Sequence, residues 1–462
     1  MTATSSSGPK MMLRSREGLV PIVNWFAFLM NVAERWMRKI KIVVATNGYK
    51  YKDLDFWRVL VYREMTRLPM GEAADDLNEE LWEQKLKGRG RKRKIPRHLG
   101  GKYPRRERLA PNESQVNRFL RELPAWVKRS MPRFIFKAQV DLAKELGILG
   151  NTIEVYIDYT NKDYYGKDRF PHNPFITGTH KGAGTNRMRK YCALMLSSGT
   201  TRLFAGVFLT RKGESKVPAI GDALAMLVEW GFTIKRVLGD REFSTYDVIT
   251  TLSKMNLPYI GTMKRTEPVK KVIDAFLMNK CSSVVSFTVN EHLSTLYKDG
   301  AIKVHLILKS DRGTRARDVR RALEQGKITL AEARKRIHVF ITTETAPLVK
   351  KRWGSWGQGI VASFRKRWRI ETGFRDCDAF TQTSHARDNE TKTLGIVLDM
   401  FAYNAWQVER AIHRKRRRVP ASWRLGPTRD RFMRKQSKII VREKNCTGLF
   451  VDQEIMSGVA VV

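Results

Sequence analysis

The sequence has few cysteines, and none of them is close to another. Cys192, Cys281, Cys377 and Cys446 form no Cys-x-x-Cys motif, which excludes a zinc knuckle and a disulfide framework. Unpaired, scattered thiols are typical of a reducing compartment. We therefore expect a cytoplasmic protein.

Long apolar runs are also missing. The longest one near the N-terminus, Leu19 to Ala33, contains Pro21 and Asn24 and is shorter than the roughly 20 residues that a membrane span needs. We interpret it as a buried helix. The segment from Met1 to Lys10 is Ser-rich and polar, so we expect no signal peptide and no membrane partner.

Acidic residues are strongly outnumbered by basic ones. The chain has 87 Lys and Arg against 46 Asp and Glu, a formal net charge of +41. A charge of this sign indicates a polyanionic partner, and we expect double-stranded DNA. With 42% hydrophobic residues, the 462-residue chain is too apolar to be disordered and long enough for two or three cores.

Composition and periodicity change several times along the chain, and five regions are expected. We predict a helical N-terminal DNA-binding module over 1–127 with a basic arm at 85–108, the first part of a catalytic core over 128–264, a β-rich insertion over 265–351, the second part of the core over 352–413, and a basic tail over 414–462.

The core region begins with short β-rich runs. IEVYIDY, KYCALMLSS and RLFAGVFLT predict three strands in close succession. A helix over Val217 to Trp230, the strand TIKRVLG, a helix over Tyr246 to Met255 and the strand LPYIGTM follow. This order is found in ribonuclease-H-like folds, so we predict an α/β protein with a mixed sheet and flanking helices. After the insertion we predict one basic helix from Ile360 to Asp378.

Three carboxylates stand at positions suited to a metal site. Strand alternation puts Asp158 on the polar face of IEVYIDY, and Asp240 follows the apolar run of TIKRVLG, where clefts in α/β sheets lie. Glu371 shares a helix face with Phe364, Arg367 and Arg375. Three such oxygen ligands can hold two Mg²⁺ or Mn²⁺ ions for phosphodiester cleavage, while arginine grips a phosphate.

Each of these residues also has a purely structural interpretation. Asp240 could cap a helix, and Arg367 with Glu371 could be a surface ion pair worth about 0.3–0.5 kcal/mol. Asp163 and Asp168 are near Asp158 but are expected in a solvated loop beyond the strand. His172 and His180 lack a His-x-x-x-His partner and are expected to be structural or to contact phosphate.

Four segments together resemble the DDE transposases of the insertion-sequence-four type, the group that includes the transposase of transposon five. They are IDYT with Tyr165 and Gly166 after it, LGDREF, the Phe-x-x-Arg-x-x-x-Glu pattern ending at Glu371, and a later apolar helix with Tyr403, Asn404 and Trp406. The resemblance covers about Ile153 to Arg414. It departs from the family signature at Phe364, where the family has Tyr, and at Asp378, where it has Lys.

The resemblance implies a prokaryotic, nucleoid-associated enzyme that binds element ends, frees 3′-OH groups and joins them to target DNA. It implies catalytic and metal-binding roles for Asp158, Asp240 and Glu371, two Mg²⁺ or Mn²⁺ ions, and a homodimeric synaptic complex. The expected DNA contacts are Arg241, Phe364, Arg367, Arg375, Trp353, Trp356, Arg91, Lys92, Arg93, Lys94, Arg414, Lys415 and Arg416. A ribonuclease-H-like nuclease without strand transfer and a non-catalytic nucleic-acid-binding protein remain open alternatives.

Overall fold

The computed structural model describes most of the chain after residue 52 and isolated positions before it. The longer described ranges are 53–87, 108–167, 172–178, 184–289, 302–311, 313–347, 352–378, 388–417 and 427–442. The predictions for Arg91, Lys92, Arg93, Lys94, Asp168 and His180 lie outside the described residues, as does the side chain of Arg416.

The chain forms two compact units. The first, here called the helical unit, comprises Met1–Leu149, Thr200–Val207 and Phe374–Val462. The second, the sheet unit, comprises Gly150–Gly199 and Phe208–Gly373. Each unit is therefore assembled from segments that are distant in sequence.

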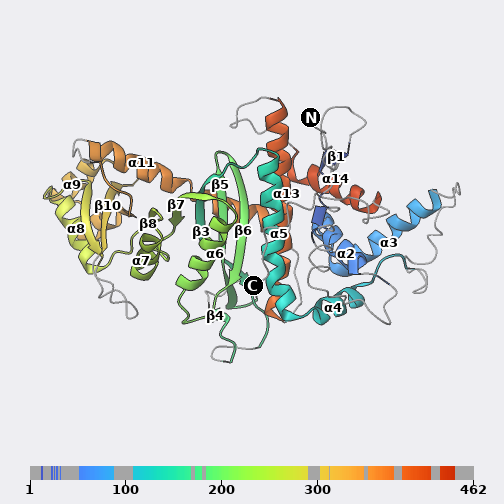
Figure 1. The fold of residues 1–462 in the computed structure, drawn as a ribbon. Helices are drawn as coiled ribbons and strands as arrows, with labels where there is room; N and C mark the ends of the chain where they lie inside the picture. The colour runs from blue at the N-terminus through green and yellow to red at the C-terminus, as the bar shows by residue number, and fades with distance from the viewer. Residues whose placement is uncertain are drawn as a thin grey trace. The chain divides into compact units, whose positions relative to one another are not determined.

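Long helices form the helical unit (Figure 1). They are α2 (Asp53–Thr66), α3 (Met70–Lys87), α4 (Glu113–Glu122), α5 (Ala125–Glu145), α13 (Asn389–Arg417) and α14 (Arg429–Arg442), with a short pair of strands, β1 (Met12–Leu13) and β2 (Ile22–Val23). The buried face of α5 packs along α13, and α2 packs against α3 and α14. Helix α5 crosses the domain boundary expected at residue 127. Helix α13 therefore packs against helices α5 and α2 from the N-terminal part of the chain.

A buried amide fixes a β-strand segment to helix α13 within the helical unit. Asn404 is fully buried, and its Oδ1 accepts a hydrogen bond from the backbone N–H of Phe204 at 2.7 Å. Its Nδ2 donates to the Phe204 carbonyl at 2.9 Å and to Oε1 of Gln139 on α5 at 2.9 Å. One side chain thus satisfies both polar groups of a buried backbone residue.

Replacing Asn404 with Leu should destabilise the protein by about 1–3 kcal/mol, because the buried N–H and carbonyl of Phe204 lose their partner. Urea unfolding followed by circular dichroism measures the change. Asn117→Leu, at an exposed position of α4, is the matched control and should change stability by less than about 0.5 kcal/mol. Equal effects of the two substitutions would contradict a structural role for the Asn404 amide.

One mixed sheet forms the centre of the sheet unit. Its strands run in the order β4 (Ile176–Gly178), β5 (Arg187–Ser198), β3 (Thr152–Asp163), β7 (Thr233–Gly239), β8 (Tyr259–Thr262), β11 (Ile337–Thr342), β10 (Ile302–Ser310) and β9 (Val284–Val289). Strand β3 is antiparallel to β5 and parallel to β7, which is parallel to β8. The predicted mixed sheet with flanking helices is confirmed.

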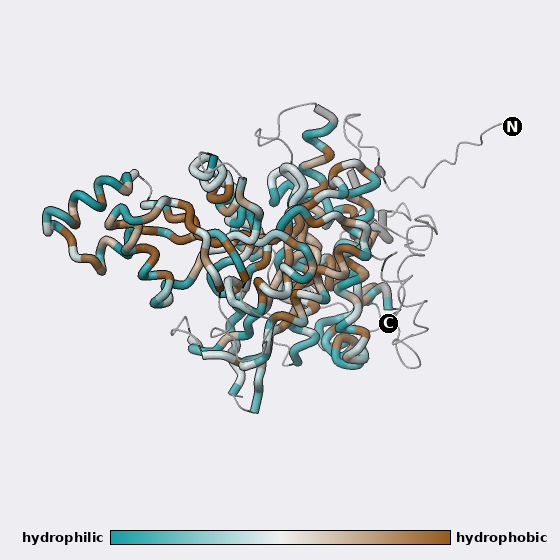
Figure 2. The backbone as a smooth tube through the Cα atoms, turned by 60° about the vertical axis from the view of Figure 1, so that its left-hand side comes forward, coloured by the Kyte–Doolittle hydropathy of each residue, from teal (hydrophilic) through white to brown (hydrophobic). Residues whose placement is uncertain are grey.

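Strand β6 (Thr201–Leu209) follows β5 through a tight turn. Gly199 has a φ of 59° there, which a residue with a side chain rarely adopts. The predicted strand runs RLFAGVFLT and KYCALMLSS therefore correspond to β6 and β5. In Figure 2 hydrophobic and hydrophilic stretches alternate along the backbone, and the side chains of β5 and β6 are largely buried.

Helices cover the sheet and accompany its insertion strands. They are α6 (Val217–Glu229), α7 (Tyr246–Lys254), α8 (Glu267–Leu277), α9 (Ala316–Glu324), α10 (Leu330–Lys335), α11 (Trp353–Arg365) and α12 (Trp368–Asp378). In Figure 1 helices α8, α9 and α11 surround strand β10. Strand β11 pairs antiparallel with β8, so the predicted β-rich insertion continues the sheet of the core.

Three local predictions are wrong. Ile22 and Val23, expected within a buried helix over Leu19 to Ala33, form strand β2, which pairs with β1. The basic segment expected as one helix over Ile360 to Asp378 is divided into α11 and α12 by a tight turn, in which the N–H of Lys366 bonds to the Ser363 carbonyl. Asp163, expected in a loop, is the last residue of β3 and pairs with Met188 of β5. The division of α11 from α12 is made by a local turn, whereas pairing with β5 extends β3 to Asp163.

No helix among the described residues is long and apolar enough to cross a membrane.

Candidate active site

Two aspartates meet where strand β7 ends beside strand β3. Strands β3 and β7 are parallel neighbours whose register pairs Ile157 with Gly239. Asp158 directly follows Ile157 and Asp240 directly follows Gly239, so the two aspartates lie side by side. Gly239 is required just before Asp240, because a Cβ there would lie 2.9 Å from Cβ of Phe243. This close approach accounts for the Gly-Asp step of LGDREF.

Arg367 connects Asp158 to Glu371. Its Nη1 donates to Oδ2 of Asp158 at 2.6 Å, and its Nη2 donates to Oε1 of Glu371 at 2.6 Å. The Arg367 and Asp158 side chains are each only 11% exposed, while Glu371 is 33% exposed. The guanidinium therefore lies between a carboxylate of the sheet and one of α12. The turn between α11 and α12 places Arg367 for this double contact.

The charges around Asp158 influence its ionisation. The pKa of the Asp158 carboxyl is raised to about 6: burial raises it most, Arg367 lowers it, and the neighbouring carboxylates of Asp240 and Glu371 raise it. The backbone N–H of Tyr159 also donates to Asp158 Oδ1 at 2.8 Å and favours the ionised form. All three predicted carboxylates are thus close enough to act on one titrating group.

Asp240 is held by a turn of its own. Its Oδ1 accepts a hydrogen bond from the backbone N–H of Glu242 at 2.7 Å, and its carbonyl accepts one from the N–H of Phe243 at 3.1 Å. The N-cap of the following helix α7 is Thr245. Asp240 therefore does not cap that helix.

The donor types of this cluster fit a hard divalent cation, which prefers carboxylate oxygens. As the side chains lie, no group of three His, Cys, Asp or Glu residues within the described ranges forms a metal-binding set. Arg367 occupies the space between Asp158 and Glu371, and its single positive charge offsets one of their two negative charges. To coordinate a shared cation, the two carboxylates have to exchange the guanidinium for the metal.

The expected aromatic DNA contacts are partly engaged within the sheet unit. Trp353 and Trp356 are half-buried in the first turns of α11, with ring centroids 6.0 and 5.4 Å from that of His305. Trp353 Nε1 also donates to the Pro347 carbonyl at 2.9 Å. Phe364 is buried, and its ring centroid lies 5.4 Å from Cζ of Arg367. Phe364 thus packs beneath the arginine that joins the carboxylates.

The remaining expected DNA contacts lie on different parts of the chain. Arg241 lines a pocket of the sheet unit. Arg375 belongs to the helical unit and is exposed. Arg414 is half-buried, and burial together with repulsion from Arg410 and Arg202 lowers its pKa. Lys415 is exposed and donates to the Leu146 carbonyl at 2.9 Å.

One exposed aromatic near the cluster was not predicted. Trp368 begins α12, three residues before Glu371, and is 59% exposed. An exposed indole beside acidic and basic groups is a suitable surface for stacking an unpaired base. The signal in the sequence was the spacing of three residues, which puts Trp368 and Glu371 on one helix face.

Comparison with known proteins gives little guidance on this chain. No family model matches it, and no curated protein matches it. Among solved structures it is similar to a chain described as a piggyBac transposase synaptic complex with hairpin DNA, with 11% sequence identity, a TM-score of 0.48, and coverage of 94% of this chain and 82% of that one. No residue role is carried over from that chain.

Proposed function

We propose that the protein is a metal-dependent DNA transposase of the DDE type, with Asp158, Asp240 and Glu371 as its catalytic carboxylates. The observation that carries the proposal is the convergence of these three residues, from segments up to 213 positions apart, around the single carboxyl of Asp158. In a chain of net charge +41, acidic residues gathered at one sheet edge suit phosphodiester chemistry on DNA.

The topology supports a ribonuclease-H-like core. Strands β5, β3, β7 and β8 are neighbours in the sheet in this order. Strand β3 is antiparallel to β5 and parallel to β7, and β7 is parallel to β8. The carboxylates come from the central strand β3, from the end of its neighbour β7, and from a helix after the insertion. This is the placement expected from the resemblance to the insertion-sequence-four type.

The chain's own residues have distinct roles in this mechanism. Asp158, Asp240 and Glu371 would hold one or two Mg²⁺ or Mn²⁺ ions, which when bound activate the attacking oxygen and stabilise the leaving one. Arg367 keeps Asp158 and Glu371 in place and can turn to a phosphate oxygen through its planar donor fork. Trp368 can stack an unpaired base near the reacting strand. We further propose element ends and target DNA as substrates, bound in a homodimeric synaptic complex.

Joining distinguishes this function from its nearest alternative. Purified protein, Mg²⁺ and a labelled duplex carrying the DNA that flanks the coding region are incubated with a supercoiled plasmid. A transposase should nick the duplex and produce covalent joints between its 3′-OH ends and the plasmid. Nicking without joints would support a ribonuclease-H-like nuclease, and neither product would support a non-catalytic DNA-binding protein.

Activity should increase with pH between about 5 and 7. Burial raises the pKa of Asp158 to about 6, and a carboxylate has to lose its proton to bind a cation. In the metal-free protein a raised carboxyl pKa stabilises the fold at low pH, and this contribution is lost as the pH rises through about 6.

The check is a pH profile of nicking at saturating DNA and at two Mg²⁺ concentrations. Because Mg²⁺ competes with the proton, the higher concentration should move the midpoint to lower pH. A midpoint that does not respond to Mg²⁺ would contradict the assignment of Asp158 as a ligand.

A further inference from the structure

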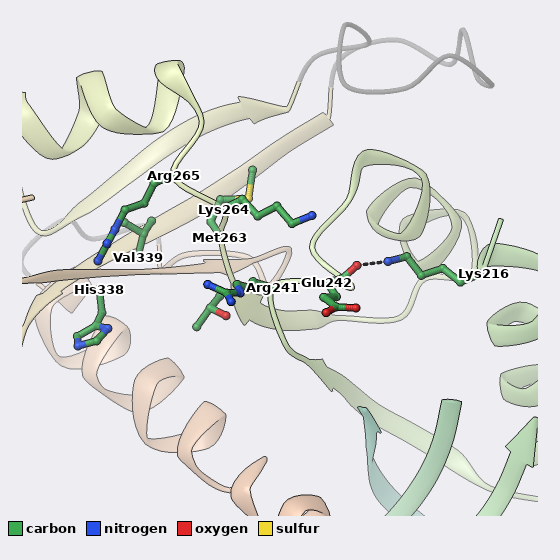
Figure 3. Close-up of a pocket in the computed structure, with 9 residues that line it drawn as sticks. Lys216, Arg241, Glu242, Met263, Lys264, Arg265, His338 and Val339 are labelled. Carbon is green, nitrogen blue, oxygen red and sulfur yellow. Dashed lines mark hydrogen bonds between the residues drawn. The ribbon is translucent and has the colours of Figure 1, made fainter. Parts of the chain in front are cut away.

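A pocket with an excess of positive charge lies next to the carboxylate cluster in the sheet unit. It has a volume of about 650 Å³ and is lined by residues from the β7–α7 loop, the start of α6, the end of β8 and strand β11. Its ionisable lining residues are Lys216, Arg241, Glu242, Lys264, Arg265 and His338 (Figure 3). Four cations thus accompany a single carboxylate.

Some of these side chains already have hydrogen-bond or ion-pair partners within the protein. Arg265 Nη2 donates to the carbonyls of Lys335 and Ile337 at 3.1 and 3.0 Å. His338 Nε2 lies 2.7 Å from Oδ1 of Asp311. The carboxylate of Glu242 is paired with Lys190, outside the pocket lining. Arg265 is thereby fixed in the wall of the pocket, while the carboxylate of Glu242 also acts on the charge of Lys216.

Two cations have no such partner. Among the described residues, the side chains of Arg241 and Lys264 make no hydrogen bond and no ion pair. Lys216 donates only to the backbone carbonyl of Glu242, as the dashed line in Figure 3 shows. Burial lowers the pKa of Lys216, the nearby carboxylates of Glu242 and Asp240 raise it, and the charges of Lys264 and Lys190 lower it. Like charges facing one another in a pocket are stabilised when an anion enters.

The position of Arg241 connects this pocket to the proposed reaction. Arg241 follows Asp240 directly in the chain, so their Cα atoms are about 3.8 Å apart. A DNA strand whose reacting phosphate lies at the carboxylates would bring a neighbouring phosphate within reach of Arg241 and Lys264. A nucleotide cofactor is a poorer match, because only Met263 and Val339 supply large apolar side chains to the lining.

We propose that this pocket binds a backbone phosphate of the DNA strand beside the reacting one, with Arg241 and Lys264 as its direct contacts and Lys216 as a supporting charge. The proposal rests on the proposed function in one respect: the reacting phosphate is taken to lie at the carboxylates. That the pocket binds a DNA phosphate is a separate claim. The pocket anchors the strand, while the carboxylates act on it.

The test is equilibrium binding of the full chain to a fluorescent 30-base-pair duplex with a single-stranded overhang, in EDTA so that no cleavage occurs. Arg241→Gln and Lys264→Gln are examined singly and together, from 50 to 200 mM salt. Each lost phosphate contact should reduce the slope of the logarithm of the binding constant against the logarithm of the salt concentration by roughly 0.9. Between 50 and 200 mM salt, the factor by which affinity falls should therefore be roughly 12 times smaller for the double variant than for the wild type.

Two controls identify the origin of the effect. Lys327→Gln removes one charge from the exposed turn between α9 and α10 and should keep the wild-type slope. Lys264→Arg keeps the pocket charge and should also bind like the wild type, which separates charge loss from misfolding. A double variant with the wild-type salt slope would overturn the proposal.

Inorganic pyrophosphate distinguishes a DNA site from a site for small anions. It should displace the duplex only at millimolar concentration. If the double variant loses pyrophosphate binding but keeps its DNA salt slope, the pocket serves a small anion and the proposal is wrong. If the wild-type protein never nicks DNA but the double variant still shows the reduced salt dependence, the pocket assignment stands and only the proposed catalytic function is refuted.

Discussion

Replacing Asp240 with Asn should reduce Mg²⁺-dependent nicking of DNA by at least about 10³-fold. The amide keeps the size of the side chain and removes the charge that would bind the cation. A metal ion supplies several kcal/mol of transition-state stabilisation, and each 1.36 kcal/mol corresponds to a tenfold change in rate. DNA binding should persist, because it depends on the basic residues.

Single-turnover nicking and DNA binding are measured on the same preparations. Asp163→Asn is the matched control, since Asp163 lies at the end of the same strand as Asp158 and is exposed. It should nick at the wild-type rate. Nicking by Asp240→Asn at the wild-type rate would remove the basis for the active-site assignment.

Replacing Arg367 with Ala should destabilise the metal-free protein by roughly 3 kcal/mol, because it leaves the buried carboxylate of Asp158 without its cation. Millimolar Mg²⁺ should restore more stability to this variant than to the wild type, since the ion neutralises the same carboxylates. Arg367→Lys should be intermediate, because one ammonium cannot reproduce the fork that contacts both Asp158 and Glu371.

Thermal unfolding with and without Mg²⁺ gives this comparison independently of activity. Arg365→Ala, at an exposed position that ends α11, is the control and should show the small Mg²⁺ effect of the wild type. If Mg²⁺ stabilises Arg367→Ala no more than the wild type, the arginine and the metal do not share their carboxylates.

The charges of the pocket and those of the carboxylate cluster are paired to different extents. In the cluster Arg367 pairs with Asp158 and Glu371, whereas the side chains of Arg241 and Lys264 in the pocket have no hydrogen-bond or ion-pair partner among the described residues. An internal cation reduces the repulsion among carboxylates when no metal is bound, while unpaired cations favour capture of an anion. The variants at the two places are therefore expected to change different measurements, rate at one and salt-dependent affinity at the other.

Local patterns in the sequence were sufficient for most strands. Alternation and turn residues predicted the strands that contain Asp158 and Asp240, because a strand with one buried face repeats every two residues. The same patterns singled out Asp158, Asp240 and Glu371 as candidates. The net charge of +41 indicated a polyanionic partner without any structural information.

The tertiary structure decided what periodicity could not. The division between α11 and α12 accompanies the contact of Arg367 with Asp158, 209 residues away in sequence, and helical spacing alone predicted one continuous helix. The joining of the insertion to the sheet depends on pairing between β8 and β11. The pocket around Arg241 and Lys264 exists only where β7, β8 and β11 meet. The sequence by itself determined which side chains are available and on which elements they stand, but long-range pairing decided which of them face one another, because strand register and ion pairs between distant segments leave no local pattern.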